Sequence, residues 1–367
     1  MKFRCDARTL RTAVSELTSI VRPDPKTDVR PAVSLGAHGN RMTLRVCDLQ
    51  GAYYAERELT IENLEVVDWE AVADLAELNN ILSVQLDKIE LELHTEVGFL
   101  RQGKTELSIP MLPYKVLKID PPALEQWYFN DETEPIVAAV SKANRHRDPN
   151  DDPRYAIVGI AFQNTDGYLE IVGTDGVSLS AVKTDMKVVG MQDILVVRPD
   201  IASVLSTYEK GRSISLAVTD VGVWIKQSER LDLIARINET YPKYQDLVDE
   251  NPVRCGTISN EELTRIKSVV QRGVVGTTDH GCVWLKAVEG HIHVWGRSDK
   301  HVQAVPTPEV EFPSLCMMAD NLVSVLNMFN QGVDVALSND GQRLFLSHEN
   351  QFAIMFIEEV RDEKQST

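Results

Sequence analysis

The apolar positions of this chain form amphipathic stripes that recur at a long, regular interval. A stripe with helical spacing begins near residue 10, and similar stripes follow about 127 and 254 residues later. These first stripes are Leu10, Ala13, Val14, Leu17 and Val21, then Ile136, Ala139, Val140 and Ala143, then Leu263, Ile266, Val269 and Val270. A second stripe follows each one: Val72, Leu75, Leu78 and Leu82, then Ile201, Val204 and Leu205, then Leu322, Val325, Leu326 and Phe329. This self-similarity predicts three copies of one domain-sized unit, because each copy is too large for a solenoid repeat.

Strand-like segments lie between the two helical stripes of each copy. In the second copy, residues 157–162, 169–172 and 178–182 are rich in β-formers and are separated by Asp166-Gly167 and Asp175-Gly176. Asp-Gly between such runs predicts tight hairpins. We therefore predict an α+β fold of three similar domains, each with two helices packed on an antiparallel sheet. Their expected bounds are 1–122, 123–252 and 253–367, the last with a short acidic C-terminal extension.

Composition bounds the class of protein. The chain has 367 residues, enough for three domains that each bury a core. It lacks both a run of about 18 apolar residues and the apolar stretch of a signal peptide, so we expect a cytoplasmic protein without a membrane association. The five cysteines are scattered and lack C-x-x-C pairing, which is typical of buried, reduced thiols.

Candidate chemistry is sparse. His291 and His293 share one face of a predicted strand but lack a third ligand at suitable spacing, and the acidic residues 148–152 are expected to form a solvated loop. The sequence contains neither a phosphate-binding glycine loop nor a nucleophile elbow. We therefore predict no catalytic residue, metal or cofactor. A net charge of −17 also argues against tight electrostatic binding of nucleic acid.

Three segments of the second copy resemble one family. They are Asp152-Pro153-Arg154-Tyr155-Ala156-Ile157-Val158-Gly159, Thr174-Asp175-Gly176-Val177-Ser178-Leu179 and Tyr241-Pro242-Lys243-Tyr244. Together they are similar to the middle domain of bacterial DNA polymerase III beta subunits, the beta sliding clamps. The opening Met1-Lys2-Phe3 and its following helix are similar to the start of that family. The resemblance covers essentially the whole chain and is strongest over 130–250.

The resemblance implies a non-catalytic DNA replication factor. Two chains would join head to tail into a homodimeric ring of six similar domains around double-stranded DNA. Such a processivity factor would tether a DNA polymerase and meet a clamp loader through short linear motifs. Because a ring holds DNA by topology, an acidic chain can serve if its inner face permits sliding without base-specific contacts.

Basic residues flank each first stripe and are candidates for that inner face, although solvated helix faces without a partner would look the same. They are Arg8, Arg11 and Arg22, then Lys142, Arg145 and Arg147, then Arg265, Lys267 and Arg272. The resemblance adds Lys26, Arg30, Arg154 and Tyr155 as DNA contacts. In the first copy, we expect the second helix to include residues 68–77, whose Glu70, Asp74 and Glu77 would make the channel less positive.

The resemblance also implies an apolar pocket for partner peptides. The matching positions are Ile157, Thr174, Gly176, Val177, Leu179, Pro242, Leu247, Met355, Phe356 and Ile357. Ordinary core packing is the alternative for these apolar residues. Asp246 and Glu358 stand where the family commonly has arginine, and an acidic rim would disfavour acidic motifs and favour basic ones.

A strand at 106–109, with Leu107 and Ile109, would be an exposed edge in a monomer. We expect it to pair across subunits near residues 271–274, where Arg272 and Val274 lie. Two alternatives remain at this stage. One is a clamp paralogue without polymerase binding, and the other is an enzyme, such as a nucleotide hydrolase, in an unfamiliar fold.

Overall fold

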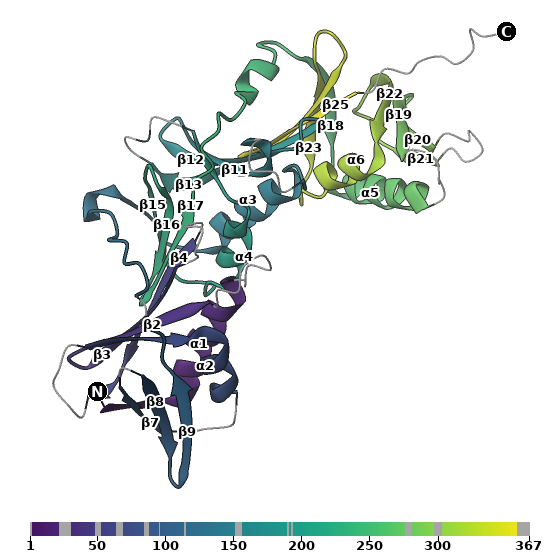
Figure 1. The fold of residues 1–367 in the computed structure, drawn as a ribbon. Helices are drawn as coiled ribbons and strands as arrows, with labels where there is room; N and C mark the ends of the chain where they lie inside the picture. Colours follow the sequence, from purple (N-terminus) through teal and green to yellow (C-terminus); the bar gives the residue numbers. More distant parts are fainter. Residues whose placement is uncertain are drawn as a thin grey trace. The chain divides into compact units, whose positions relative to one another are not determined.

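The computed structural model describes residues 2–21, 31–47, 53–63, 69–83, 88–94, 96–113, 115–150, 156–188, 191, 194–275, 281–296 and 303–357. Within these residues the order of elements repeats three times (Figure 1). Each copy has a strand, a helix, a run of strands, a second helix and three final strands. The helices are α1 (Ala7–Ile20), α2 (Leu75–Leu82), α3 (Glu134–Arg145), α4 (Asp200–Ser206), α5 (Asn260–Val275) and α6 (Ala319–Leu326). None of these described helices combines the length and apolar composition that crossing a membrane requires.

The strands complete the three copies. In the first copy they are β1 (Lys2–Asp6), β2 (Ala32–His38), β3 (Arg41–Cys47), β4 (Tyr53–Thr60), β5 (Glu62–Asn63), β6 (Trp69–Asp74), β7 (Lys88–Leu93), β8 (Val97–Gln102) and β9 (Thr105–Pro110). In the second they are β10 (Trp127–Asn130), β11 (Ile160–Thr165), β12 (Tyr168–Thr174), β13 (Ser178–Lys187), β14 (Leu195–Val197), β15 (Ile214–Val218), β16 (Gly222–Gln227) and β17 (Arg230–Ala235). In the third they are β18 (Val253–Ile258), β19 (Cys282–Val288), β20 (His291–Gly296), β21 (Gln303–Pro306), β22 (Phe312–Met318), β23 (Val333–Leu337), β24 (Arg343–His348) and β25 (Gln351–Phe356). Short 3-10 turns are η1 (Leu124–Gln126), η2 (Ala156–Val158) and η3 (Tyr244–Leu247).

Contacts group the chain into two units, and each unit contains part of the second copy. The first unit comprises residues 1–134 and 200–236, and the second comprises 135–199 and 237–367. The three domain boundaries expected from the sequence therefore remain a proposal. The α+β class with antiparallel sheets is confirmed.

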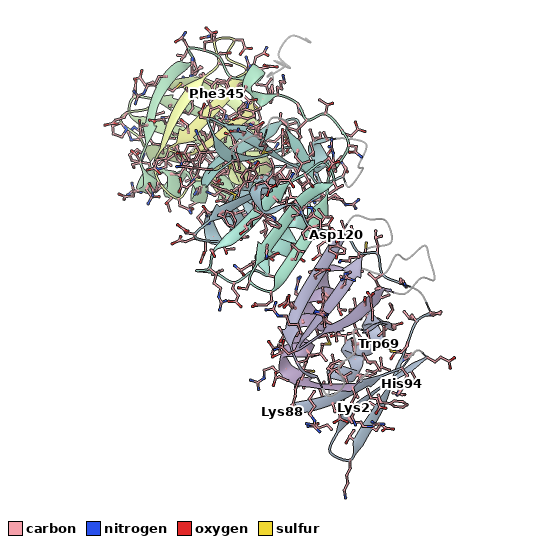
Figure 2. The ribbon with its side chains drawn as sticks, turned by 90° about the vertical axis from the view of Figure 1, so that its left-hand side faces the viewer. Lys2, Trp69, Lys88, His94, Asp120 and Phe345 are labelled. Carbon is pink, nitrogen blue, oxygen red and sulfur yellow. The ribbon has the colours of Figure 1, made fainter. Side chains whose placement is uncertain are left out.

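Each unit holds one long sheet and one short sheet. The first unit contains the orders β5-β1-β7-β8-β9 and β10-β15-β16-β17-β4-β3-β2-β6. The second unit contains β14-β11-β12-β13-β25-β24-β23-β18 and β21-β20-β19-β22. Side by side, α1 and α2 pack in the first unit, as α5 and α6 do in the second (Figure 1). Phe345 on β24 belongs to the buried core of the second unit (Figure 2).

The two long sheets are both formed by joining strands from neighbouring copies. Strand β17 of the second copy pairs with β4 of the first, with Asp232 opposite Ala55. Strand β25 of the third copy pairs with β13 of the second, with Ile354 opposite Leu179. In both junctions the last strand of one copy pairs with the third strand after the first helix of its neighbour. The same pairing of strands through backbone hydrogen bonds therefore occurs twice in the chain.

The first stripe folds as expected. Helix α1 begins after Asp6, whose carboxylate accepts a hydrogen bond from the Thr9 backbone N–H at 2.7 Å. Leu10, Val14 and Leu17 are buried at the helical spacing read from the sequence.

The expected helix at 68–77 is wrong at its start. Residues 69–74 form strand β6, which pairs with β2, and α2 begins only at Leu75. Asp74 is the N-cap, accepting from the Glu77 N–H at 3.0 Å, and Glu70 accepts from Arg45 Nη1 at 3.0 Å. Of the three acidic residues assigned to this helix face, only Glu77 lies in the helix, which removes most of the case for an acidic face.

The Asp-Gly turn predicted between β11 and β12 is confirmed. Asp166 and Gly167 adopt φ of 55° and 84°, the left-handed values that a two-residue hairpin needs. Ile157 and Val158, expected in the preceding strand, instead lie in η2.

A buried ionic cluster lies at the β17–β4 junction. The Asp232 carboxylate is fully buried and accepts hydrogen bonds from Arg57 at 3.1 Å and Arg230 Nε at 2.9 Å. The Tyr53 and Tyr208 hydroxyls also donate to it. Burial alone would raise the pKa of Asp232, but the two guanidinium groups outweigh burial and hold that pKa below its usual value.

We predict that Asp232→Asn lowers the free energy of unfolding by about 3–5 kcal/mol at pH 7, because it leaves the buried Arg57 and Arg230 with only the partly exposed Glu16 as a counter-charge. The lowered pKa means that the carboxylate contributes stability above its unfolded-state pKa of about 3.9, and that this contribution is lost as pH falls through the folded-state value. Urea unfolding at pH 7 and at about pH 3 measures both effects. Asp185→Asn, at an exposed position of β13, is the control and should change little. Equal stability of the two variants at pH 7 would contradict the prediction.

Candidate functional site

Apolar side chains of β13 and β25 form one face of the long sheet in the second unit. Leu179 is opposite Ile354, so both side chains point to the same face, and both are buried in one apolar cluster. Phe356, two residues beyond Ile354, lies on that face and is half-buried. Its backbone N–H donates to the Val177 carbonyl at 3.0 Å, which brings Val177 to the same place. Val177 is 40% exposed.

The segment containing η3 packs against this face. Tyr241 and Tyr244 are buried in the cluster, and Leu247 is half-buried against it. Tyr244 donates its hydroxyl to Glu170 at 2.9 Å, and burial raises the pKa of Tyr244 well above its usual range. We call Val177, Leu179, Leu247 and Phe356 the anchor surface.

Arg343 fixes the position of this segment. Its guanidinium donates to the Leu247 carbonyl at 2.6 Å, to Asp249 at 3.4 Å and to Asp340 at 3.2 Å. Asp249 also accepts from the Asn339 backbone N–H at 2.5 Å. The turn before β24 and the chain after η3 are thus held together beside the anchor surface.

The turn between β12 and β13 is shaped by its own side chains. The Thr174 hydroxyl donates to the Ser178 carbonyl at 2.7 Å, and Asp175 accepts from the Val177 and Ser178 N–H groups at 2.8 and 2.6 Å. Gly176 has φ of 87°, a conformation that favours glycine. These bonds present Val177 outward.

The structure divides the ten predicted pocket positions. The anchor surface gathers four of them; Thr174 and Gly176 shape the adjoining turn, and Pro242 is exposed between the two buried tyrosines. Ile157 is half-buried in η2, and the Ile357 N–H donates to the Gln342 carbonyl at 2.8 Å. Met355 needs correction: it is opposite Ser178, so it points to the other face of the sheet and is 2% exposed.

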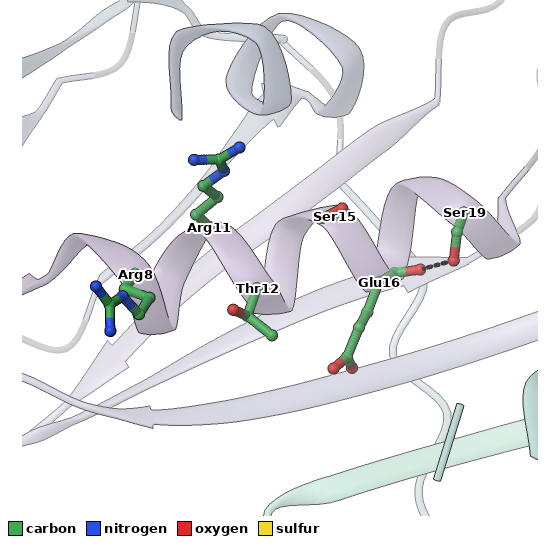
Figure 3. A pocket seen from close by; sticks show the side chains of 6 residues that line it. All are labelled: Arg8, Arg11, Thr12, Ser15, Glu16 and Ser19. Atoms are coloured by element: carbon green, nitrogen blue, oxygen red, sulfur yellow. Dashed lines mark hydrogen bonds between the residues drawn. The ribbon is translucent and has the colours of Figure 1, made fainter. Parts of the chain in front are cut away.

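The candidate DNA-facing residues divide similarly. Arg8 and Arg11 are exposed on α1, beside a hollow of about 470 Å³ that Thr12, Ser15, Glu16 and Ser19 also line (Figure 3). Glu16 accepts from Arg57 Nε at 2.9 Å, so its charge is compensated within the first unit.

Several other helix cations donate to groups within the second unit. Lys142 donates to Gln351 at 2.8 Å, and burial lowers its pKa. Lys267 donates to the Phe329 carbonyl at 2.7 Å, and burial lowers its pKa as well. Arg147 donates to Asn144 and to the Asp148 carbonyl, both at 2.9 Å, whereas Arg145 is exposed. The predicted contacts Lys26, Arg30, Arg154 and Tyr155, together with Arg22, lie outside the described residues.

The expected dimer residues also divide. Strand β9 is at the edge of its sheet, as predicted, with Leu107 half-buried and Ile109 buried. Arg272 and Val274, expected near its mate, lie in helix α5, and their place in a dimer interface stays a prediction. In the described sheets the third copy offers three edge strands, β18, β21 and β22, and of these β21 (Gln303–Pro306) is the third strand after helix α5.

His146 is a buried residue that links three elements and that was not identified from the sequence. Its Nδ1 lies 3.3 Å from the Ser178 hydroxyl and its Nε2 lies 3.3 Å from the Ser324 hydroxyl, linking the end of α3 to the 175–178 turn and to α6. Burial lowers its pKa to about 4, against the opposing effect of Asp175, so it is neutral at pH 7. His146 stands among polar residues in the sequence, so no apolar pattern predicted that it would be buried.

The fold defined by these elements is that of the DNA sliding clamps. No protein-family model matches the sequence. No curated protein matches it either. Solved structures of bacterial DNA polymerase III beta subunits do match, each over 98% of this chain and 100% of its own length. They include those of Caulobacter crescentus (16% identity, TM-score 0.83) and Pseudomonas aeruginosa (13%, 0.81). The Helicobacter pylori beta clamp bound to a DNA ligase peptide also matches (14%, 0.79). The resemblance read from the sequence is thereby confirmed at the level of the fold.

We predict that Met355→Ala lowers the free energy of unfolding by about 2–5 kcal/mol, because it removes a buried side chain from the core. Val177→Ala, at an exposed turn position of the anchor surface, should change it by less than about 0.5 kcal/mol. Denaturant unfolding of the two variants checks this difference. Equal losses of stability would place Val177 in the core and contradict the assignment of faces.

Proposed function

We propose that this protein is a non-catalytic DNA sliding clamp, a homodimeric ring that encircles duplex DNA and tethers replication proteins through peptide motifs. The likeness to solved clamp structures supports the fold, and the sheet junctions support the assembly. The two strand junctions are the observation that most strongly supports the proposed ring. Two junctions join copies within the chain, and the corresponding strands β9 and β21 are left as edges in the described sheets.

Pairing of β9 with β21 of a second chain would repeat the β17–β4 and β25–β13 arrangement. β9 is the last strand of the first copy, as β17 and β25 are of theirs. β21 is the third strand after helix α5, as β4 and β13 are after α1 and α3. An unpaired edge of this kind invites association, and a two-fold dimer would cover both edges of both chains.

The DNA contact would be weak and topological. Exposed Arg8, Arg11 and Arg145 supply positive charge on the first helices, while Lys142 and Lys267 are committed to neighbouring groups. With few exposed cations on the described first helices and a net charge of −17, strong binding to open DNA is not expected. Partner binding at the anchor surface is proposed by analogy with the peptide-bound Helicobacter pylori clamp.

We predict a dimer of 41.1 kDa chains that depends on the β9 edge. Leu107→Pro and Ser108→Pro form an informative pair, because successive N–H groups of a strand point to opposite sides. One variant should lose the β8–β9 ladder, and the other should keep its melting temperature but sediment as a monomer. Ser108→Ala, which keeps the N–H, is the control. A wild-type monomer at micromolar concentration in analytical ultracentrifugation would count against the ring.

We further predict that DNA retention depends on closed DNA. Protein placed on nicked circles by a cognate clamp loader should remain bound during gel filtration and should leave when a restriction enzyme linearises the circle. Linear DNA with protein-blocked ends is the control and should retain the ring. Tight binding to a short linear duplex at physiological salt would refute topological retention.

A further inference from the structure

The acidic border of the anchor surface carries an inference about its partners, which rests on the proposed peptide site. Asp246 is exposed and directly precedes Leu247 of the anchor surface. Asp175 accepts from the Val177 N–H, and Asp249 and Asp340 both accept from Arg343. Glu250, next to Asp249, is exposed. Within 241–250 the carboxylates Asp246, Asp249 and Glu250 outnumber the one basic residue, Lys243, whereas Asp175 lines a hollow together with Arg145 and Arg147.

The arginine at this border is already occupied by protein groups. The Arg343 side chain is 16% exposed, and its guanidinium group donates to Asp249, Asp340 and the Leu247 carbonyl. An incoming carboxylate would have to displace these bonds or meet the negative field of the neighbouring acids. Lys243 is exposed but is the only other basic residue in the segment 241–250. The surface thus opposes an acidic partner and attracts a basic one.

The apolar part of the surface constrains the partner's shape. Val177, Leu247 and Phe356 are the accessible members, and they come from a turn, a 3-10 helix end and a strand end. Three partly exposed apolar side chains beside a sheet suit large apolar anchors on a short extended segment. Asp246 directly precedes Leu247. A Lys or Arg next to the peptide anchor that contacts Leu247 would therefore lie close to the Asp246 carboxylate.

We propose that the anchor surface binds a short extended peptide with large apolar anchors and a Lys or Arg adjacent to them. The apolar anchors provide most of the affinity, and the charge selects among partners that share such anchors. Exposed ion pairs contribute little individually, so the expected preference is about two- to five-fold between a basic and a neutral flank.

A matched peptide set tests this inference on the full-length protein. Fluorescein-labelled peptides carry every pair of anchors drawn from Leu, Ile, Met and Phe, and each pair is made with a Lys, Gln or Glu flank. For each anchor pair that binds, fluorescence anisotropy should give the lowest dissociation constant for the peptide with the Lys flank and the highest for the peptide with the Glu flank. The difference should shrink as salt is raised from low to physiological concentration. In Asp246→Lys the ranking should reverse.

Two variants separate the failure of this inference from that of the proposed peptide site. Asp185→Lys makes the same charge change at an exposed position seven residues beyond Ser178 on β13, and it should keep the wild-type ranking. Val177→Asp should weaken every peptide. Peptides that bind equally with all three flanks, but lose binding in Val177→Asp, would overturn the charge preference and leave the peptide site standing. If no peptide binds the wild type, or Val177→Asp has no effect, both proposals fail.

Discussion

Backbone pairing between copies is the constraint on which the rest of this structure depends. A copy of this unit ends in a strand with an open edge, and an open edge of apolar strands is a liability in water. At β17–β4 and at β13–β25 the edge of one copy is covered by the next, producing two eight-stranded sheets from shorter parts. The anchor surface exists only because of this pairing, since Leu179 and Phe356 belong to different copies and meet across the β13–β25 junction.

Much of the fold could be predicted from the sequence because its signals are local. The stripe of α1 and its Asp6 cap, and the Asp166-Gly167 hairpin, are each encoded within a few residues. The error at 68–77 arose because Ala71, Val72 and Ala73 are all buried in strand β6, so alternation did not mark a strand. Asp74 followed by Glu77 was a usable signal for a later helix start.

The candidate site was less predictable, because its residues meet through long-range register. Nothing near Met355 in the sequence shows that it faces away from Leu179; the pairing of Ser178 with Met355 decides it. Strand β21 is only four residues long, and neither its existence nor its edge position follows from its composition. The solved clamps compared share the fold at 13–16% identity, as expected of a fold that depends on backbone bonds and apolar pattern more than on particular side chains.

The charge cluster around Asp232 makes the β17–β4 junction chemically different from the β13–β25 junction. Arg57 on β4 and Arg230 and Asp232 on β17 lock that pairing, whereas the directly opposed residues at the β13–β25 junction are uncharged. A buried ion pair favours the correct neighbouring strand, because pairing with another strand would leave a buried charge without its counter-charge. If the proposed ring forms, separating the strands at this junction would cost more than separating a junction without buried charges.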